Sequence, residues 1–296
     1  MKVSFIVVTY RRGKVLQVCL DSIYAQSGLS LPYEIIIIDN GGDAEIVPPS
    51  NPQIQLRIER PEQNLWAAGG RNLGIQLAQG EFLVLLDDDA AWHADTDAAQ
   101  LISHLEKDAK CGCAAGISLT PDGVPIPVEL PHPNKAYVLS AKTPIEVPYC
   151  FVTGIVFRAD IVKRLGGYPT RFGIYMEEID LSLRLIDAGY RIVYDPAIAT
   201  YHYKSNAGRS VVGDKYWKAS AINKSRFAWR LLPQPYPFTT LFIWTMAAVI
   251  KSRNPMLLWD IWKSLWTERA LIRRERKPVR PETIRYLKSI GARLWY

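Results

Sequence analysis

Three consecutive aspartates, Asp87, Asp88 and Asp89, follow six mostly apolar residues at positions 81–86. The apolar run is too short and ends too abruptly for a helix, so it predicts a buried strand that ends at the acids. In open α/β sheets, ligands bind outside the carboxyl ends of strands. Neighbouring carboxylates repel one another unless a cation neutralises them, and hard divalent cations bind carboxylates and substrate phosphates together. We therefore expect Asp87 and Asp89 to hold Mg²⁺ or Mn²⁺ that grips the diphosphate of a nucleotide-activated substrate; the alternative is a solvated acidic turn.

The first hundred residues alternate between predicted strands and helices. Residues 3–8 form an apolar run rich in β-branched side chains, as expected of a central parallel strand. A helix with one apolar face follows at residues 15–24 and is broken by Gly28 and Pro32. Further strands are expected at 33–38, 54–58 and 81–86, with a helix at 67–78. This repetition predicts a parallel sheet with helices on its faces, and in outline a nucleotide-binding α/β unit.

The pattern is less regular between Cys111 and residue 205. Five prolines predict a loop that cannot be helical: Pro121, Pro125, Pro127, Pro131 and Pro133. Around this loop we expect strands at 114–119, 151–158 and 191–194, a short helix at 159–165, and a helix from about 181 that stops at Gly189.

The composition is that of a globular protein, with 48% hydrophobic and 22% charged residues in a chain of 296. That length suits one large α/β domain with an appendage, or two small domains. The four cysteines, Cys19, Cys111, Cys113 and Cys150, have neither metal-ligand spacing nor a disulfide framework, so we expect buried, reduced thiols. The N-terminus starts a strand at once and lacks a signal-peptide pattern, so we expect a cytoplasmic catalytic part.

The formal net charge of +7 is concentrated towards the C-terminus. Residues 251–296 contain 12 Lys and Arg against 4 Asp and Glu, a local charge of +8, which leaves −1 for the preceding 250 residues. A basic tail on a near-neutral domain indicates an acidic partner surface, either anionic lipid or nucleic acid.

Residues 231–250 carry no charge, but three prolines at 233, 235 and 237 leave only 238–250 as a clean apolar helix, which is short for a membrane span. Beyond it, one helical face carries Leu258, Trp259, Trp262, Leu265 and Trp266 beside basic residues. Trp next to Lys and Arg is typical of a helix that lies in the headgroup region. We expect residues 236–280 to bind a membrane surface; packing in a core or an oligomer, and a true span, are the alternatives. The oligomeric state is left open.

Five short motifs follow one another along the first 205 residues. They are residues 5–11 (FIVVTYR), 35–40 (IIIIDN), 64–74 (NLWAAGGRNLG), 85–89 (LLDDD) and 177–184 (EEIDLSLR), with Gly154 before the last and Gly189, Tyr190 and His202 after it. In this order they resemble the motifs of family 2 glycosyltransferases, and most closely the subgroup of rhamnosyl-, galactofuranosyl- and related cell-surface glycan transferases. The resemblance implies an α/β fold of GT-A type, with a Rossmann-like, mostly parallel central sheet flanked by helices.

The resemblance also implies a domain division. Residues 1–205 would form the catalytic domain, with a nucleotide-binding half at 1–110 and an acceptor-binding half at 111–205. The resemblance ends near residue 205, and the composition of residues 206–296 predicts a helical, basic and aromatic extension that associates with membranes.

On the donor side, the resemblance places Thr9, Tyr10 and Arg11 where the base and ribose of the donor would lie. Asp39 would accept a hydrogen bond from the base or ribose; alternatively it is a turn former before two glycines. Gly69, Gly70 and Gly74 are implied to permit close backbone approach to the nucleotide. Arg71 would pair with phosphate or with an acid of the metal site. Asp87 and Asp88 are the remaining implied donor contacts. His202 is implied as a metal or diphosphate ligand beside Asp87 and Asp89.

On the acceptor side, Glu178 is the implied general base, which takes the proton of a sugar hydroxyl as the new bond forms. The commoner family pattern has Glu-Asp where this chain has Glu177 and Glu178, so Glu177 and Asp180 stay open as alternatives. The metal ion would act as a Lewis acid on the departing diphosphate, and in-line attack would invert the anomeric carbon. Acids at a helix N-terminus also interact favourably with the helix dipole, and the alternative for Asp180 is that it only stabilises the start of this helix.

The sequence thus predicts an inverting, metal-dependent glycosyltransferase. It would move a sugar from a nucleotide-diphosphate-sugar to a hydroxyl of a glycan or glycolipid acceptor, on the inner face of the cell membrane, in cell-surface polysaccharide or glycolipid synthesis. A sugar-phosphate nucleotidyltransferase is the alternative enzyme, but the sequence lacks a strong Gly-rich, Lys-bearing loop near the first strand. A nucleic-acid-binding protein is the third candidate; against it, the tail aromatics are not interleaved with the basic cluster at 273–277.

Overall fold

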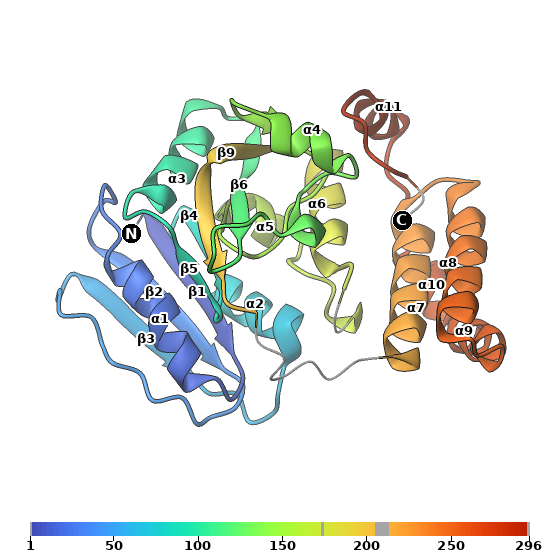
Figure 1. Cartoon of the computed structure of the whole chain (residues 1–296), viewed down its shortest axis with the longest axis horizontal. Helices are drawn as coiled ribbons and strands as arrows, with labels where there is room; N and C mark the ends of the chain where they lie inside the picture. Colours follow the sequence, from blue (N-terminus) through green and yellow to red (C-terminus); the bar gives the residue numbers. More distant parts are fainter. Residues whose placement is uncertain (1, 173–174, 205–212, 295–296) are drawn as a thin grey trace.

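A nine-stranded sheet forms the centre of the computed structural model, which describes residues 2–172, 175–204 and 213–294 (Figure 1). The strand order is β3-β2-β1-β4-β8-β6-β9-β5, and β7 also pairs with β9. The strands are β1 (Val3–Thr9), β2 (Tyr33–Asp39), β3 (Ile54–Glu59), β4 (Phe82–Asp87), β5 (Ala90–Trp92), β6 (Cys111–Leu119), β7 (Ile145–Glu146), β8 (Ile155–Arg158) and β9 (Arg191–His202). The helices between residues 13 and 187 are α1 (Gly13–Tyr24), α2 (Trp66–Leu77), α3 (Asp97–Lys107), α4 (Lys135–Ser140), α5 (Ala159–Arg164) and α6 (Glu177–Asp187).

The four N-terminal strands of the sheet are parallel, as expected. β1 lies between β2 and β4, and β2 pairs with β3. The β1 side chains alternate between two buried clusters: Phe5 and Val7 pack with α1 and α3, whereas Ile6 packs on the side of α2. Because these strands run in the same direction, Thr9, Asp39 and Asp87 end at one edge of the sheet.

The sheet becomes mixed beyond β4. β8 is antiparallel to β4 and to β6, and both β5 and β7 are antiparallel to β9. Only the β6–β9 pair is parallel in this half of the described sheet, so the expectation of a mostly parallel arrangement holds for the N-terminal half alone. Only two residues, Asp88 and Asp89, lie between β4 and β5, which leaves no room for a parallel crossover connection. β5 pairs instead with the end of β9.

Two glycines of α2 face β1. A Cβ atom at Gly70 would lie 2.7 Å from Val8 Cγ1, and one at Gly74 would collide with Ile6 Cγ2. The glycines therefore allow the helix to pack closely on the strand. Close approach of a nucleotide to the backbone at Gly70 and Gly74 stays a prediction.

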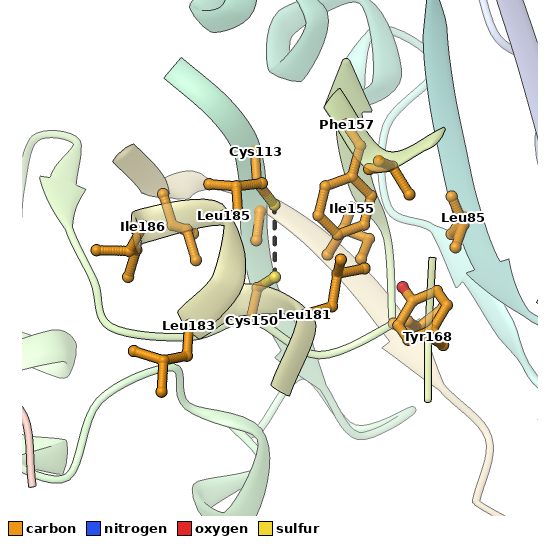
Figure 2. Packing of buried hydrophobic residues seen from close by; sticks show 14 of the residues in the cluster. Leu85, Cys113, Cys150, Ile155, Phe157, Tyr168, Leu181, Leu183, Leu185 and Ile186 are labelled. Atoms are coloured by element: carbon orange, nitrogen blue, oxygen red, sulfur yellow. Dashed lines mark hydrogen bonds between the residues drawn. The ribbon is translucent and has the colours of Figure 1, made fainter. Parts of the chain in front are cut away.

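The core beneath α6 contains two of the four cysteines. All four are buried and unbridged, as expected, and the Sγ atoms of Cys113 and Cys150 lie 3.4 Å apart. Figure 2 shows this pair among apolar side chains that include Leu181 and Leu185 of α6. Packing of this helix face positions the N-terminal turn of α6, which carries Glu177 and Glu178.

Three local predictions between residues 121 and 202 were wrong in extent. The proline-rich segment contains a short 3₁₀ helix at Pro127–Glu129 and is followed by α4, although the prolines predicted no helix. Of the strand expected at 151–158, only β8 (Ile155–Arg158) has strand geometry. The strand expected at 191–194 continues to His202, because its second half pairs with β5 and β6.

The C-terminal extension is helical, as expected, and comprises α7 (Asp214–Leu231), α8 (Tyr236–Ser252), α9 (Met256–Thr267), α10 (Arg269–Glu275) and α11 (Pro281–Ser289). Helices α7, α8 and α9 share a small core of Ala221, Ile222, Ala248, Leu257 and Ile261. Leu265 packs against this core, whereas Trp259, Trp262 and Trp266 are 67%, 52% and 67% exposed. Among the helices of the described residues, none combines the length and the apolar character needed to cross a membrane.

Candidate active site

The acidic turn after β4 meets the end of β9. Asp87 is the last residue of β4, and Asp88 and Asp89 connect it to β5. His202 lies opposite Ala90 in the antiparallel β5–β9 pair, so its ring is beside Asp89, with 3.1 Å between Nε2 and Oδ1. Ligand atoms of Asp87, Asp89 and His202 all lie within 4.8 Å of one another. The structure therefore brings together the three residues that the sequence analysis expected to bind a metal ion.

Asp88 turns back towards the first strand. Its Oδ2 accepts a hydrogen bond from Thr9 Oγ1 at 2.7 Å, and its Oδ1 lies 3.1 Å from Arg12 Nη1. The same Arg12 nitrogen lies 2.8 Å from Asp89 Oδ2. Arg12 was missed by the sequence analysis, although it directly follows the first motif at residues 5–11. Its charge neutralises part of the acidic turn from the side of β1.

The pKa values of these groups reflect their burial and their partners. Burial raises the pKa of Asp88 to about 6, although Thr9 and Arg12 oppose the rise. Burial also raises the pKa of Asp87, in spite of the opposing charge of Arg71. For Asp89 and His202, burial is outweighed by their mutual hydrogen bond. The pKa of Asp89 is lowered and that of His202 is raised to about 10, with Glu129 contributing to the second shift.

Glu129 is a second residue that the sequence analysis missed. It belongs to the 3₁₀ helix of the proline-rich segment, and its carboxylate lies 3.0 and 3.1 Å from His202 Nδ1. Lys204 lies 2.5 Å from the same carboxylate. A carboxylate on Nδ1 orients the ring so that Nε2 points at Asp89. We call Asp87, Asp89 and His202 the metal-ligand group. No local sequence signal distinguishes Glu129 from an ordinary surface acid.

Arg71 of α2 connects the acidic turn to the start of α6. Its Nη2 donates to Asp87 Oδ1 at 2.8 Å, and its Nη1 lies 3.5 Å from Glu177 Oε1 and 3.7 Å from Glu178 Oε1. The Arg71 side chain is 9% exposed. Within the described residues, Arg71 Nη1 and Glu177 Oε2 are buried without a hydrogen-bond partner. Such orphaned polar atoms mark a place where a substrate oxygen or hydroxyl can bind.

The two glutamates at the start of α6 differ in their surroundings. Tyr175 and Met176, which lead into the helix, both have positive φ angles (72° and 74°), a strained arrangement for non-glycine residues. Glu178 Oε1 accepts a hydrogen bond from Val152 N at 2.8 Å. Burial, followed by the charge of Glu177, raises the pKa of Glu178 well above its ordinary value. The Glu178 side chain is 18% exposed and that of Glu177 is 7% exposed, so Glu178 is the more accessible of the two.

Asp180 does not belong to this group, which corrects its place among the candidate bases. Its carboxylate is 0% exposed; Oδ1 accepts from Arg184 Nε at 2.7 Å, and Oδ2 accepts from Arg230 Nη1 on α7. Both oxygens are thus used in holding α6 to α7. Residues two apart on a helix do not share a face, so the turn that brings Glu178 to the site directs Asp180 into the interface behind it.

The other predicted donor-side residues surround the carboxyl ends of β1 and β2. Asp39 is fully buried, and its oxygens accept from the backbone N–H groups of Gly41, Gly42 and Ala44 and from Arg60 Nε. The carboxylate therefore shapes the turn, in line with the alternative interpretation, and contact with a base or ribose stays a prediction. Tyr10 is 42% exposed with the Arg11 guanidinium 5.2 Å from its ring centroid. Contact of Tyr10, Arg11 and Gly69 with a nucleotide also stays a prediction.

The overall chain path is that of GT-A type glycosyltransferases. One solved structure with this fold is the mannosyltransferase PcManGT from Pyrobaculum calidifontis in complex with GDP-Man and Mn²⁺, with a TM-score of 0.58 and 20% identity over 97% of this chain and 79% of that one. Another is S. aureus TarS 1–349 in complex with UDP-GlcNAc, with a TM-score of 0.61 and 16% identity over 86% of this chain and 74% of that one. These similarities concern the fold.

The chain belongs to glycosyl transferase family 2, whose family model matches residues 4–166. Among curated relatives, the uncharacterized glycosyltransferase YwdF of Bacillus subtilis is 33% identical over 111 residues, which cover 37% of this chain and 38% of that protein. The O-antigen chain rhamnosyltransferase RfbN of Salmonella typhimurium is 26% identical over 204 residues, which cover 66% of this chain and 64% of that protein. The glycosyltransferase AglE of Haloferax volcanii is 26% identical over 208 residues, with coverages of 65% and 64%. The chain thus spans less than two thirds of the length of each of these relatives.

Proposed function

We propose that the protein is an inverting, metal-dependent glycosyltransferase that moves a sugar from a nucleotide-diphosphate-sugar to a hydroxyl of a glycan or glycolipid acceptor. One observation carries this proposal. A single buried guanidinium, that of Arg71, joins a carboxylate of the metal-ligand group to the two glutamates at the start of α6. Donor diphosphate and acceptor base are therefore a side chain's length apart, as transfer of a sugar between them requires.

The residues present fit a divalent cation. Asp87 and Asp89 offer carboxylate oxygens and His202 offers an imidazole nitrogen within 4.8 Å of one another. Carboxylate-rich groups of this kind suit Mg²⁺ and Mn²⁺. A bound cation would supply Lewis-acid stabilisation of the negative charge on the departing diphosphate. Arg12 and Arg71, which flank the acids, add positive charge for the phosphates.

The chemical step follows from the position of Glu178. Its carboxylate takes the proton of the acceptor hydroxyl while that oxygen bonds to the anomeric carbon of the donor sugar. The bond from this carbon to the diphosphate oxygen breaks on the opposite face, so the configuration at the carbon inverts. Burial and the charge of Glu177 raise the pKa of Glu178, which makes its carboxylate a better proton acceptor than an exposed one. We expect the exposed residues Tyr10 and Arg11 to contact the nucleoside, whereas Thr9 is buried and its hydroxyl donates to Asp88.

The C-terminal extension supports a membrane-associated acceptor. Trp259, Trp262 and Trp266 project from α9 into solvent, and the Arg269 guanidinium lies 4.4 Å from the Trp266 ring centroid. Exposed Trp beside basic residues suits the headgroup region of an anionic membrane. We propose a cytoplasmic catalytic domain held at the inner face of the cell membrane through residues 236–280. The similarity to RfbN favours a hexose or deoxyhexose donor and a role in cell-surface glycan synthesis.

A thermal-shift screen of nucleoside diphosphates and sugar nucleotides, with and without Mn²⁺, tests the proposal. At least one nucleotide should raise the melting temperature in a Mn²⁺-dependent manner, because a ligand that binds only the native state stabilises it. NMR of the product should then show an anomeric configuration opposite to that of the donor. Failure of every common nucleoside diphosphate to bind would refute the proposal.

A further inference from the structure

The segment that follows β6 holds Glu129 in a fixed position beside the end of β9. Ile126, the residue before the 3₁₀ helix, donates its backbone N–H to Ser118 O of β6 at 3.0 Å. Leu130, the residue after that helix, is 1% exposed and belongs to the core. β6 in turn pairs with β9, whose last residue is His202. The carboxylate is therefore carried by a segment that is tied to the sheet at one end and anchored in the core at the other.

Two carboxylates hold the imidazole of His202 from its two nitrogens. Asp89 Oδ1 lies 3.1 Å from Nε2, and the oxygens of Glu129 lie 3.0 and 3.1 Å from Nδ1. The side chains of Asp89, Glu129 and His202 are only 10%, 10% and 11% exposed. Lys204 lies 2.5 Å from Glu129 Oε1 and holds this carboxylate from the other side. The ring can therefore turn only by giving up charge-assisted contacts in a place where little water can replace them.

The contact at Nδ1 decides which atom His202 offers to a cation. Because Glu129 occupies Nδ1, the nitrogen left for a metal ion is Nε2, which lies on the side of Asp89. A carboxylate on the far nitrogen of a metal-binding histidine fixes the ring and makes it a better ligand. Among the described residues, the metal-ligand group consists of Asp87, Asp89 and His202 and does not include Glu129. Glu129 therefore acts on the site through His202.

A fixed imidazole distinguishes between the two cations that carboxylates alone would accept. Mg²⁺ takes oxygen ligands in a nearly ideal octahedron and keeps several of its waters. Imidazole nitrogen is a better ligand for transition-metal ions, of which Mn²⁺ is one. With His202 held beside Asp87 and Asp89, the site gains a nitrogen ligand that benefits Mn²⁺. With the ring free to turn away, only the oxygen ligands would remain, and the advantage of Mn²⁺ would be lost.

We propose that Glu129 is a positioning residue that fixes His202 as a metal ligand and thereby makes the site prefer Mn²⁺ to Mg²⁺. This inference rests on the proposed function, in which Asp87, Asp89 and His202 hold the cation that binds the donor diphosphate. It goes further by assigning the choice of cation to an acid outside the metal-ligand group.

The affinities of the full chain for Mn²⁺ alone and for Mg²⁺ alone test the inference. Electron paramagnetic resonance of free Mn²⁺ gives the first affinity, and competition by Mg²⁺ gives the second. Glu129→Ala should weaken Mn²⁺ binding roughly ten- to hundredfold and leave Mg²⁺ binding nearly unchanged. Glu129→Gln should recover most of the loss, because its side-chain carbonyl still accepts from Nδ1. Asp195→Ala is the matched control at another carboxylate–histidine contact, 2.7 Å from His104 Nε2, and should change neither affinity.

The spectrum of bound Mn²⁺ gives a second readout that does not depend on affinity. Electron spin echo envelope modulation detects a nitrogen nucleus coordinated to Mn²⁺. The wild type should show the nitrogen of an imidazole ligand. Glu129→Ala should lose this signal, as His202→Ala does, while Asp195→Ala keeps it. Thermal melting without added cation checks the fold of each variant.

The outcomes separate this inference from the proposed function. Equal losses of Mn²⁺ and Mg²⁺ affinity in Glu129→Ala would show a merely structural role, and would overturn the inference. A wild-type Mn²⁺ affinity or an unchanged nitrogen signal in Glu129→Ala would overturn it as well. In these cases the proposed function stands as long as the wild type binds a nucleoside diphosphate with Mn²⁺. If the wild type binds neither Mn²⁺ nor any nucleotide, the inference and the proposed function fail together.

Discussion

Replacing Asp180 by asparagine removes the charge from a fully buried carboxylate that holds α6 against α7. The side chains of its partners Arg184 and Arg230 are only 17% and 15% exposed, so water cannot fully replace the lost carboxylate. Removing one partner of a buried ion pair costs about 3–5 kcal/mol of folding free energy. We expect the lower end, about 3 kcal/mol, because Arg184 still donates to the carbonyl groups of Leu165 and Gly167.

Thermal unfolding and steady-state kinetics measured side by side test this expectation. A loss of about 3 kcal/mol corresponds to a fall in melting temperature of roughly 6–12 °C, at about 2–4 °C per kcal/mol. Below the transition, kcat should change by about twofold or less, whereas loss of a general base lowers it by roughly 10²–10⁴. Asp160→Asn is the matched control. It is also an acid four residues before an arginine, 3.4 Å from Arg164, but it is 69% exposed and should cost about 0.5 kcal/mol or less.

Asp180→Asn thus distinguishes a structural carboxylate from a catalytic one. A variant that melts like the wild type but loses a hundredfold or more in kcat would make Asp180 a catalytic group. It would also refute the reasoning that both of its oxygens are used up in the α6–α7 interface.

The remaining predictions concern the site and the tail. Glu178→Gln should lower kcat by roughly 10²–10⁴ at unchanged donor affinity, since glutamine still accepts from the Val152 N–H; wild-type turnover would exclude Glu178 as the base. In the wild type, kcat should decline on acidification already at a pH above 4.5, the ordinary pKa of a glutamate, because the raised pKa means that Glu178 takes up its proton at a higher pH. A kcat that stays constant down to pH 4.5 would contradict this. Asp89→Asn should abolish the Mn²⁺-dependent part of the nucleotide thermal shift, and a full shift would remove Asp89 from the metal-ligand group. Trp262→Ala should weaken flotation with anionic vesicles about tenfold or more, whereas Trp66→Ala, at the same 52% exposure, should not; equal effects would argue against a tail-specific contact.

Sequence reasoning was most successful where structure is local. The strand expected at 3–8 is Val3–Thr9, and the helix expected at 67–78 is Trp66–Leu77. Central parallel strands are apolar on both faces, so their pattern is visible in the chain alone. Sequence reasoning was least successful where the pairing of distant strands determines how far a strand extends. The second half of β9 (Arg191–His202) is held in strand geometry by β5 and β6.

The same division applies to the site. The run of three aspartates and the later histidine could be recognised as candidate metal ligands from their types and from the family resemblance. Glu129 and Arg12 could not, because their contacts with His202 and with Asp88 and Asp89 join segments far apart in the chain.

The sequence by itself determined which chemical groups stand at the ends of the strands and at the start of α6. Only the tertiary structure decided which of these acids remain open to a substrate. Asp39 and Asp180 are hydrogen-bonded within the protein and have 0% exposed side chains, whereas the side chains of Asp87, Asp89 and Glu178 remain 29%, 10% and 18% exposed. The physical reason is that the availability of a carboxylate depends on the donors that folding brings to it from other elements, and spacing along the chain does not specify those donors.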